Sequence, residues 1–351
     1  IDQDVAQSII DAVDEILVED FMRFFPLSIW QTGSGTQTNM NVNEVIANKS
    51  KGKIHPNDHV NRGQSTNDVF PSGMQIMAVL MIENKLLKSI DNLIKAFDNL
   101  NEKYGSTIKT GRTHYQDATP LTFGQEISAW TAMLEDGKTE VEDSLTSLKQ
   151  LLIGGTFIHL ENKFMGISSV NAMMNAHHGL SLLATNLMKI GNDLRFLASG
   201  PRTGIGEINL PENEPGSSIM PGKVNPTQIE ALTMVCLQVM SNHQALLLAN
   251  SQGHLQLNVY LPLVAYNFWQ SVRLLSDSIM SFTKKCVEGI TINKKKMQDN
   301  LEKTLMTATI LTKELGYDYV TELVKKAHKE PKSIKEVIME LGVLDEKSSK
   351  N

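Results

Sequence analysis

Cysteine is scarce in this chain of 351 residues, which contains only Cys236 and Cys286. Both cysteines fall inside apolar patterns of helical spacing, so a disulfide framework of the kind that holds small secreted domains together is not expected. Two thiols also cannot supply the four thiolates that usually hold an iron–sulfur cluster. These observations indicate a reducing compartment, which is the cytoplasm, or the mitochondrial matrix if the source is a eukaryote.

Long apolar runs and an excess of positive charge are missing as well. The longest apolar run, around residues 77–82, is far shorter than the roughly 20 residues that cross a bilayer, and no signal peptide is recognisable. The formal net charge of −6 argues against a nucleic-acid-binding surface. It also means that a site for an anionic ligand must collect its positive charge locally. The nine histidines show no metalloprotease spacing, so neither a metal nor another cofactor is predicted.

Helical periodicity is what the sequence has in abundance. The apolar residues between Leu86 and Leu100 are separated by 4, 3, 4 and 3 positions, and those between Phe268 and Phe282 repeat that spacing. Such spacing puts one apolar stripe on a helix. Further periodic stretches lie at about 123–152, 168–198 and 226–250. The pattern predicts five long helices in an all-α bundle, with few strands.

The two ends of the chain differ from this middle. Residues 1–65 combine short helical pieces with a Gly/Thr/Asn-rich segment, and the helical pattern already present at Ile1 indicates that the natural chain starts upstream. From about residue 295 the chain becomes rich in lysine, with shorter helices. We predict an N-terminal domain at 1–65, a central helical-bundle domain at 66–294 and a small helical C-terminal domain at 295–351. The tail from Asp345 to Asn351 is expected to fray.

One segment, Gly-Ser-Ser-Ile-Met-Pro-Gly-Lys-Val-Asn-Pro at residues 216–226, stands apart from the periodic pattern. Its glycines permit unusual backbone angles and its prolines restrict others, which predicts a shaped loop. The hydroxyls of Ser217 and Ser218, the charge of Lys223 and the amide of Asn225 suit an anion. Carbon-acid chemistry beside a carboxylate needs such groups, because negative charge develops in its transition state.

Two other polar segments offer hydrogen-bond donors. Residues 32–39 form a Gly/Thr-rich stretch without the Gly-Lys-Ser/Thr ending of a phosphate-binding loop, and a polar cap before a helix beginning near Met40 is the simpler interpretation. Residues 63–68 predict an N-cap cluster. A helix N-terminus carries free N–H groups and partial positive charge, so it can also hold a carboxylate.

Two histidine-containing segments complete the set. Residues 111–120 read as a polar loop around His114, and a lone histidine in such a loop is more often structural than catalytic. His55-Pro56-Asn57-Asp58 predicts a turn with an Asx cap. The doublet His177-His178 is expected to face two directions on a helix.

The loop at 216–226, the preceding Pro-Glu-Asn-Glu-Pro at 211–215 and the following Thr227-Gln228 together resemble the fumarase/aspartase superfamily, and class II fumarases in particular. The resemblance implies an all-α, fumarase/aspartase-like fold, with a central five-helix bundle between small terminal domains and a twenty-helix core in a homotetramer. It implies the reversible hydration of fumarate to L-malate through an aci-carboxylate, a step of the tricarboxylic acid cycle that needs no metal.

The same resemblance implies an active site built by three subunits. It assigns Ser217 as the base and His114 as the holder of a water molecule, with Glu230 as the acid that pairs with His114. The substrate-binding residues that it implies are Ser34, Thr36, Ser65, Thr66, Asn67, Thr113, Lys223 and Asn225. A second dicarboxylate site near the entrance would use His55, Asn57 and Asp58, although the turn described above explains these residues equally well.

Two alternatives stay open. Aspartate ammonia-lyase is the nearest, because Gln256-Leu257-Asn258 resembles aspartases and Leu261 stands where fumarases usually carry a basic residue. His114 favours the hydratase, since aspartases typically carry glutamine at that position. A non-catalytic structural bundle protein is the other alternative, because the superfamily includes a lens crystallin, but the intact hydroxyl, lysine, asparagine and histidine set favours an enzyme. Relative to the family, the chain also shows gaps between Lys49 and Lys53 and after Gly154-Gly155-Thr156.

Overall fold

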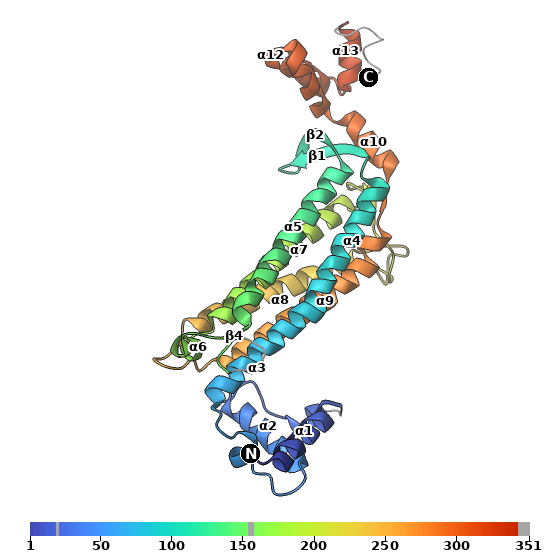
Figure 1. Cartoon of the computed structure of the whole chain (residues 1–351). Helices are drawn as coiled ribbons and strands as arrows, with labels where there is room; N and C mark the ends of the chain where they lie inside the picture. The colour runs from blue at the N-terminus through green and yellow to red at the C-terminus, as the bar shows by residue number, and fades with distance from the viewer. Residues whose placement is uncertain (19–20, 154–157, 343–351) are drawn as a thin grey trace. The chain divides into compact units, whose positions relative to one another are not determined.

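The structure, a computed structural model, describes residues 1–18, 21–153 and 158–342. The gap after Thr156 and the terminal tail predicted to fray therefore lie outside the described residues. Five long helices dominate the remainder (Figure 1), which confirms the predicted all-α fold: α4 (Leu87–Tyr104), α5 (Phe123–Leu148), α7 (Asn171–Leu197), α8 (Thr227–Asn250) and α9 (Leu261–Lys285).

Each long helix follows the apolar stripe that predicts it. On α4 the side chains of Ile90, Leu93 and Phe97 are fully buried, and on α9 the same holds for Phe268 and the other apolar residues of its stripe. Burial of one apolar face removes it from water, and this term dominates the stability of such helices. Contacts group the chain into two compact units, unit 1 (Ile1–Asp91, Leu134–Met188 and Ala231–Met280) and unit 2 (Asn92–Met133, Lys189–Glu230 and Ser281–Asn351).

Unit 1 contains the N-terminal helices and the segments that precede α4. Its core includes Ala78, Ile82, Leu180 and Leu246, all fully buried. Its shorter elements are α1 (Gln3–Val18), η1 (Phe21–Phe24), α2 (Thr36–Lys49), η2 (Pro56–Val60), α3 (Thr66–Met81), η3 (Ile82–Leu86), α6 (Lys163–Ser168), and the parallel pair β3 (Gln150–Leu151) and β4 (Ile158–His159).

Unit 2 centres on Trp130 of α5, which is fully buried between the rings of Phe97 and Phe123 and donates its indole N–H to Asp193 at 3.0 Å. Its shorter elements are the antiparallel pairs β1 (Ile108–Thr113) with β2 (Gln116–Thr122) and β5 (Ile208–Asn209) with β6 (Thr291–Ile292), then η4 (Val287–Gly289), α10 (Lys294–Lys303), η5 (Leu305–Leu311), α11 (Thr312–Leu315), α12 (Tyr317–Lys329) and α13 (Ile334–Glu340).

The segment at 111–120, predicted to be a polar loop, is instead most of a β-hairpin (Figure 1). The prediction was wrong because the strands are short and polar, without the apolar alternation that marks a half-buried strand. Thr113 pairs with Gln116, so only His114 and Tyr115 form the connection. The strand register shifts between Thr110 and Gly111, which indicates a β-bulge.

Helix α8 is apolar on all sides. Leu232, Cys236 and Val239 are buried, while Met234 and Leu237 on the same helix are more than half exposed. By length and composition alone α8 could cross a membrane, with a mean hydropathy of 1.2 over an 18-residue window, of which 33% is buried. A helix that is hydrophobic all round is either buried in a large core or a membrane span. A single helix of this kind is weak evidence for a span, since a core helix has the same composition.

Candidate active site

The segment at 216–226 is an irregular loop, as predicted, and it is closed by its own backbone. The N–H of Gly216 donates to the carbonyl of Lys223 at 2.9 Å, and the side-chain amide of Asn225 donates to the carbonyl of Gly216 at 2.6 Å. A Cβ at residue 216 would lie 2.3 Å from the Lys223 carbonyl oxygen, so only glycine permits this closure. The loop thus places Ser217, Lys223 and Asn225 within one small turn.

The side chain of Ser217 is held by the backbone of this loop. Its Oγ accepts hydrogen bonds from the backbone N–H groups of Ile219 at 3.3 Å and Met220 at 3.2 Å. Two oriented N–H groups stabilise negative charge on an oxygen more than they stabilise a neutral hydroxyl. The Lys223 side chain, on the same loop, is exposed. This arrangement can both bind an anion and favour loss of the serine proton.

The tip of the β1–β2 hairpin presents His114 to solvent. His114 and Tyr115 have φ values of 55° and 58°, in the left-handed region. Two successive residues with positive φ are the geometry of a type I′ turn, whose twist matches that of two antiparallel strands. The ring of Tyr115 packs on Phe196, with centroids 4.8 Å apart. The turn therefore costs some backbone strain and holds the imidazole in an exposed position.

In unit 1, the segments at 32–39 and 63–68 meet through Asn39. This side chain is 7% exposed, and its amide donates to the Thr66 hydroxyl at 2.9 Å and to Asn61 Oδ1 at 3.3 Å. In the first segment, the hydroxyls of Ser34 and Thr36 are hydrogen-bonded to each other at 2.8 Å. Asn39 was not singled out by the sequence interpretation, because a buried asparagine on a helix leaves no local pattern. It joins two of the predicted substrate-binding segments.

The capping predictions for these two segments have different outcomes. Ser65 caps α3 by accepting from the N–H of Asn67 at 3.2 Å, which confirms the predicted N-cap at 63–68. The polar cap before a helix near Met40 is wrong, because α2 already begins at Thr36 and its N-cap, Gly35, makes no side-chain cap hydrogen bond. Gly35 has φ of 78°, and a Cβ there would lie 2.5 Å from the ring of Phe70.

The turn at 55–58 is capped by histidine rather than by an Asx residue. His55 Nδ1 accepts from the N–H groups of Asn57 at 3.3 Å and Asp58 at 3.1 Å, at the start of the π-helical turn η2. The carboxylate of Asp58 lies 3.3 Å from the same nitrogen. The predicted Asx cap is therefore wrong, since the imidazole occupies the acceptor position.

The predicted site residues divide between the two units. Unit 1 contains Ser34, Thr36, Ser65, Thr66, Asn67, His55, Asn57 and Asp58, and unit 2 contains Thr113, His114, Ser217, Lys223, Asn225 and Glu230. Glu230 lies in the first turn of α8, as predicted. A carboxylate there is favoured by the helix dipole. The pairing of Glu230 with His114 stays a prediction.

Behind the hairpin lies a buried ionic cluster that the sequence did not reveal. Glu207 is fully buried and accepts two hydrogen bonds from the guanidinium of Arg112, at 2.7 and 3.1 Å. Lys109, 1% exposed, lies 3.2 Å from Glu207 and also donates to Glu126 at 2.9 Å. Burial by itself would raise the pKa of Glu207, but the hydrogen bonds of Arg112 and the charge of Lys109 outweigh it and lower that pKa.

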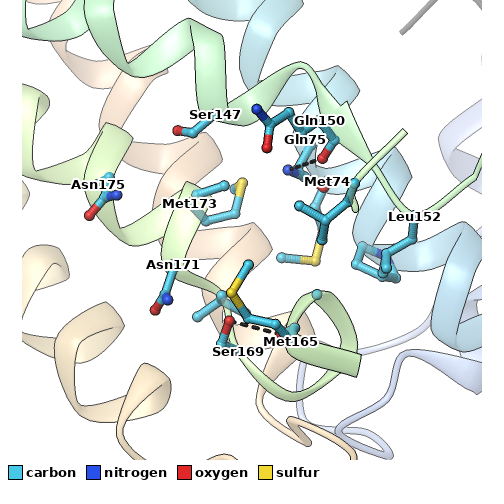
Figure 2. Close-up of a pocket in the computed structure, with 15 residues that line it drawn as sticks. Met74, Gln75, Ser147, Gln150, Leu152, Met165, Ser169, Asn171, Met173 and Asn175 are labelled. Carbon is cyan, nitrogen blue, oxygen red and sulfur yellow. Dashed lines mark hydrogen bonds between the residues drawn. The ribbon is translucent and has the colours of Figure 1, made fainter. Parts of the chain in front are cut away.

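Two cavities differ in chemical character. A cavity of about 330 Å³ in unit 2 lies beside the hairpin and is lined by charged and aromatic residues that include Arg112, His114 and Tyr115. A cavity of about 210 Å³ in unit 1 is lined by methionines and amides, among them Met74, Met173 and Gln75 (Figure 2). The described residues that line this second cavity carry no formal charge, so it does not match a dicarboxylate. Across the described part of the chain, no group of three or more His, Cys, Asp or Glu residues could hold a metal ion.

Comparison with known proteins identifies similar chains. A family model described as "Lyase" matches residues 1–160 and 156–241, and one described as "Fumarase C C-terminus" matches residues 308–350. "Fumarate hydratase class II" of Helicobacter pylori is 49% identical over 376 residues, covering 97% of this chain and 81% of the relative. The protein of that name from Bordetella parapertussis is 45% identical over 383 residues, covering 99% and 83%.

Solved structures agree with these sequence relatives. The class II fumarase of Schistosoma mansoni superimposes with a TM-score of 0.95 at 38% identity, covering 99% of this chain and 84% of that one. The "fumarate lyase:delta crystallin" of Brucella melitensis gives a TM-score of 0.91 at 36% identity, covering 97% and 85%.

Proposed function

This chain belongs to the class II fumarase family of lyases, and from that membership we propose how its residues carry out the reversible hydration of fumarate to L-malate, a reaction of the tricarboxylic acid cycle. The activity is that of a carbon–oxygen lyase, a fumarate hydratase. The observation that carries the assignment of residues is the closed loop at 216–226, in which two backbone N–H groups point at Ser217 Oγ beside Lys223 and Asn225.

In the malate direction, Ser217 removes a proton from the carbon next to one carboxylate. That carbon acid is weak, and it reacts only if the carboxylate accepts a second negative charge as an aci-carboxylate. Lys223 and Asn225 stabilise this dianion, because fixed donors are worth most where charge develops. An ordinary serine is a poor base, and the N–H groups of Ile219 and Met220 activate Ser217 by stabilising its alkoxide.

The leaving hydroxide receives its proton through His114. Glu230 is the proposed partner that sets the tautomer and basicity of the imidazole, so that His114 holds and activates water in the hydration direction. The exposed position of His114 at the tip of a strained two-residue turn supports this role, because a structural histidine gains little from such a place. The carboxylates and the hydroxyl are bound by Ser34, Thr36, Ser65, Thr66, Asn67, Thr113, Lys223 and Asn225.

We propose that the active site forms only in a homotetramer, from three subunits. Two features support this. The exposed apolar side chains of Met234, Leu237 and Leu248 on α8 form a surface that a monomer would leave in water. None of the predicted site residues is buried within one chain, whereas stabilising an aci-carboxylate calls for a site from which water is excluded. Packing α8 and its neighbours into a shared core would bury these apolar side chains and enclose the site residues.

Three further assignments accompany this proposal. The turn at His55, Asn57 and Asp58 is proposed as a second dicarboxylate site from the family resemblance alone, because its N–H groups at Asn57 and Asp58 already donate to His55 Nδ1. The division into domains at 1–65, 66–294 and 295–351 is proposed from composition and periodicity. A cytoplasmic location is proposed, supported by two buried cysteines that form no disulfide.

A spectrophotometric assay separates the alternatives. Fumarate absorbs in the ultraviolet, so the purified protein is mixed with L-malate in one sample and with L-aspartate in another. We expect absorbance to rise with malate alone. A rise with aspartate would assign the chain as an ammonia-lyase, and no rise with either would favour the structural bundle protein.

A further inference from the structure

We propose that Glu207 is a positioning residue for the hydration reaction, which holds the β1–β2 hairpin so that Thr113 and His114 stand in register with the substrate. This inference rests on the proposed function. Glu207 touches neither substrate nor reacting atoms in the proposed mechanism, and it acts through Arg112, the residue immediately before Thr113.

Both carboxylate oxygens of Glu207 have hydrogen-bonding partners. Arg112 Nη2 donates to one oxygen at 2.7 Å and Nη1 to the other at 3.1 Å, a two-point contact that sets the plane of the guanidinium. Lys109 Nζ lies 3.2 Å from one oxygen, and the side-chain amide of Asn300 donates to the other at 2.9 Å. Three side chains from two elements of unit 2 therefore converge on one acid: Lys109 and Arg112 from β1, and Asn300 from α10.

The backbone of Glu207 is held as firmly as its side chain. Its N–H donates to the carbonyl of Leu197, at the last residue of α7, at 2.9 Å. Its own carbonyl accepts from the N–H of Asn293, the N-cap of α10, at 2.8 Å. Glu207 therefore cannot follow the hairpin if the hairpin moves. The rigid member of the contact is the acid, and the member being positioned is the strand that carries Arg112.

Charge balance makes the cluster sensitive to single changes. Two cations, Lys109 and Arg112, face two carboxylates, Glu207 and Glu126, and Lys109 and Glu207 are almost completely buried. Removal of one carboxylate leaves a buried cation without compensation. Yet a buried ion pair is weak evidence for stability, because well-packed apolar residues often stabilise equally well. Direction is what the ion pair adds: apolar contacts are non-directional, whereas a two-point guanidinium–carboxylate contact fixes orientation.

The hairpin needs such an anchor. Residues 113–117 are exposed. At the tip, the ring of Tyr115 packs on that of Phe196. His114 sits in a left-handed conformation that relaxes if the strands are free to shift. A displacement of about 1 Å of a reacting group can cost on the order of 100-fold in rate. The anchor through Arg112 and Glu207 prevents that displacement.

The test uses Arg112→Lys, which keeps the charge but cannot make two parallel hydrogen bonds, and Glu207→Gln combined with Lys109→Gln, which removes the carboxylate without leaving an extra cation. Val337→Ala, a truncation in the apolar core of α12 and α13, serves as the stability control. For each tetramer, kcat and KM for fumarate are measured per folded enzyme, together with hydrogen exchange of the amides at 108–122.

We expect both cluster variants to lower kcat by on the order of 100-fold, to raise KM because Thr113 is displaced, and to speed hydrogen exchange in the hairpin. Val337→Ala should lower thermal stability and leave kcat, KM and hairpin exchange unchanged. Cluster variants that lose stability but keep kcat would show a purely structural role and overturn the inference. A wild-type protein that does not hydrate fumarate would instead overturn the proposed function, so the two failures are distinct.

Discussion

The imidazole of His177 lies stacked on that of His243 inside unit 1, with ring centroids 5.5 Å apart and ring planes 14° from parallel. His177 Nε2 lies 2.8 Å from the hydroxyl of Ser271, and that hydroxyl donates its own proton to the carbonyl of Asn267. The imidazole must therefore donate through Nε2, which leaves Nδ1 unprotonated. Nδ1 is buried and has no hydrogen-bond partner among the described residues.

This pair predicts a dependence of stability on pH. Burial, and secondly the charge of His243, lower the pKa of His177 from 6.5 to about 3. The unfolded chain therefore binds a proton near pH 6.5, whereas the folded chain does not bind one until about pH 3. The contribution of His177 to stability is complete above pH 6.5 and is lost as the pH falls towards 3, by up to about 1.4 kcal/mol per pH unit.

The measurement is the urea midpoint of unfolding between about pH 4.5 and 7. His177→Gln, which keeps a donor towards Ser271 but cannot titrate, should show a shallower fall than the wild type. His328→Gln, at an exposed position of α12, is the matched control and should fall as the wild type does. Equal slopes for His177→Gln and the wild type would contradict the prediction.

Replacement of Ser217 by alanine should remove the base without unfolding the loop, because the closure of the loop depends on Gly216 and Asn225. A positioned base contributes about 100- to 10,000-fold, so kcat should fall within that range. Steady-state hydration of fumarate is the assay, with circular dichroism to show that folding is intact. Ser128→Ala, on an exposed face of α5, should keep wild-type activity. Near-full turnover in Ser217→Ala would rule out the serine as base.

His114→Asn isolates the chemistry of the imidazole from the geometry of the turn. Asparagine tolerates positive φ better than other non-glycine residues, so the two-residue connection should survive. We expect kcat to fall by about 100-fold or more, while thermal stability stays close to that of the wild type. His328→Asn is the control. A variant that keeps its activity would remove His114 from the mechanism.

Lys223→Met should act mainly on anion binding. A hydrogen bond to a charged group is worth about 1.5–3 kcal/mol, which corresponds to a loss of about 10- to 150-fold in kcat/KM. Kinetics are measured alongside the binding of a non-reactive dicarboxylate by calorimetry. Lys284→Met, at an exposed position near the end of α9, is the control: it makes the same change in net charge and should leave binding and kinetics unchanged. Unchanged binding in Lys223→Met would show that another group holds the carboxylate.

Leu237→Lys tests whether α8 forms a shared core. Leu237 is 58% exposed in the single chain, so a lysine there is harmless to a monomer. In a packed assembly the same lysine buries a charge, which is costly. We expect light scattering to show dissociation of the tetramer, with loss of activity at the same protein concentrations. A variant that stays tetrameric and active would exclude this face of α8 from the interface.

Several features of this protein were determined by the sequence alone. The five long helices follow from apolar residues repeated every three or four positions, a local pattern that survives any tertiary arrangement. The loop at 216–226 is likewise local, since its glycines and prolines exclude helix and strand. The cap at Ser65 follows from residue type and position. The resemblance to the lyase family rests on the contiguous residues 211–228.

Only the tertiary structure decided the rest. The β1–β2 hairpin depends on pairing between two polar strands, which lack the apolar alternation from which strands are predicted. Asn39 and Thr66 are 27 positions apart, and Arg112 and Glu207 are 95 apart, so their contacts leave no trace in the spacing of residues. Local patterns record which face of an element is apolar, whereas hydrogen bonds between distant polar residues depend on where the chain brings them. For that reason the sequence could nominate candidate site residues, but it could not predict the contact between Arg112 and Glu207.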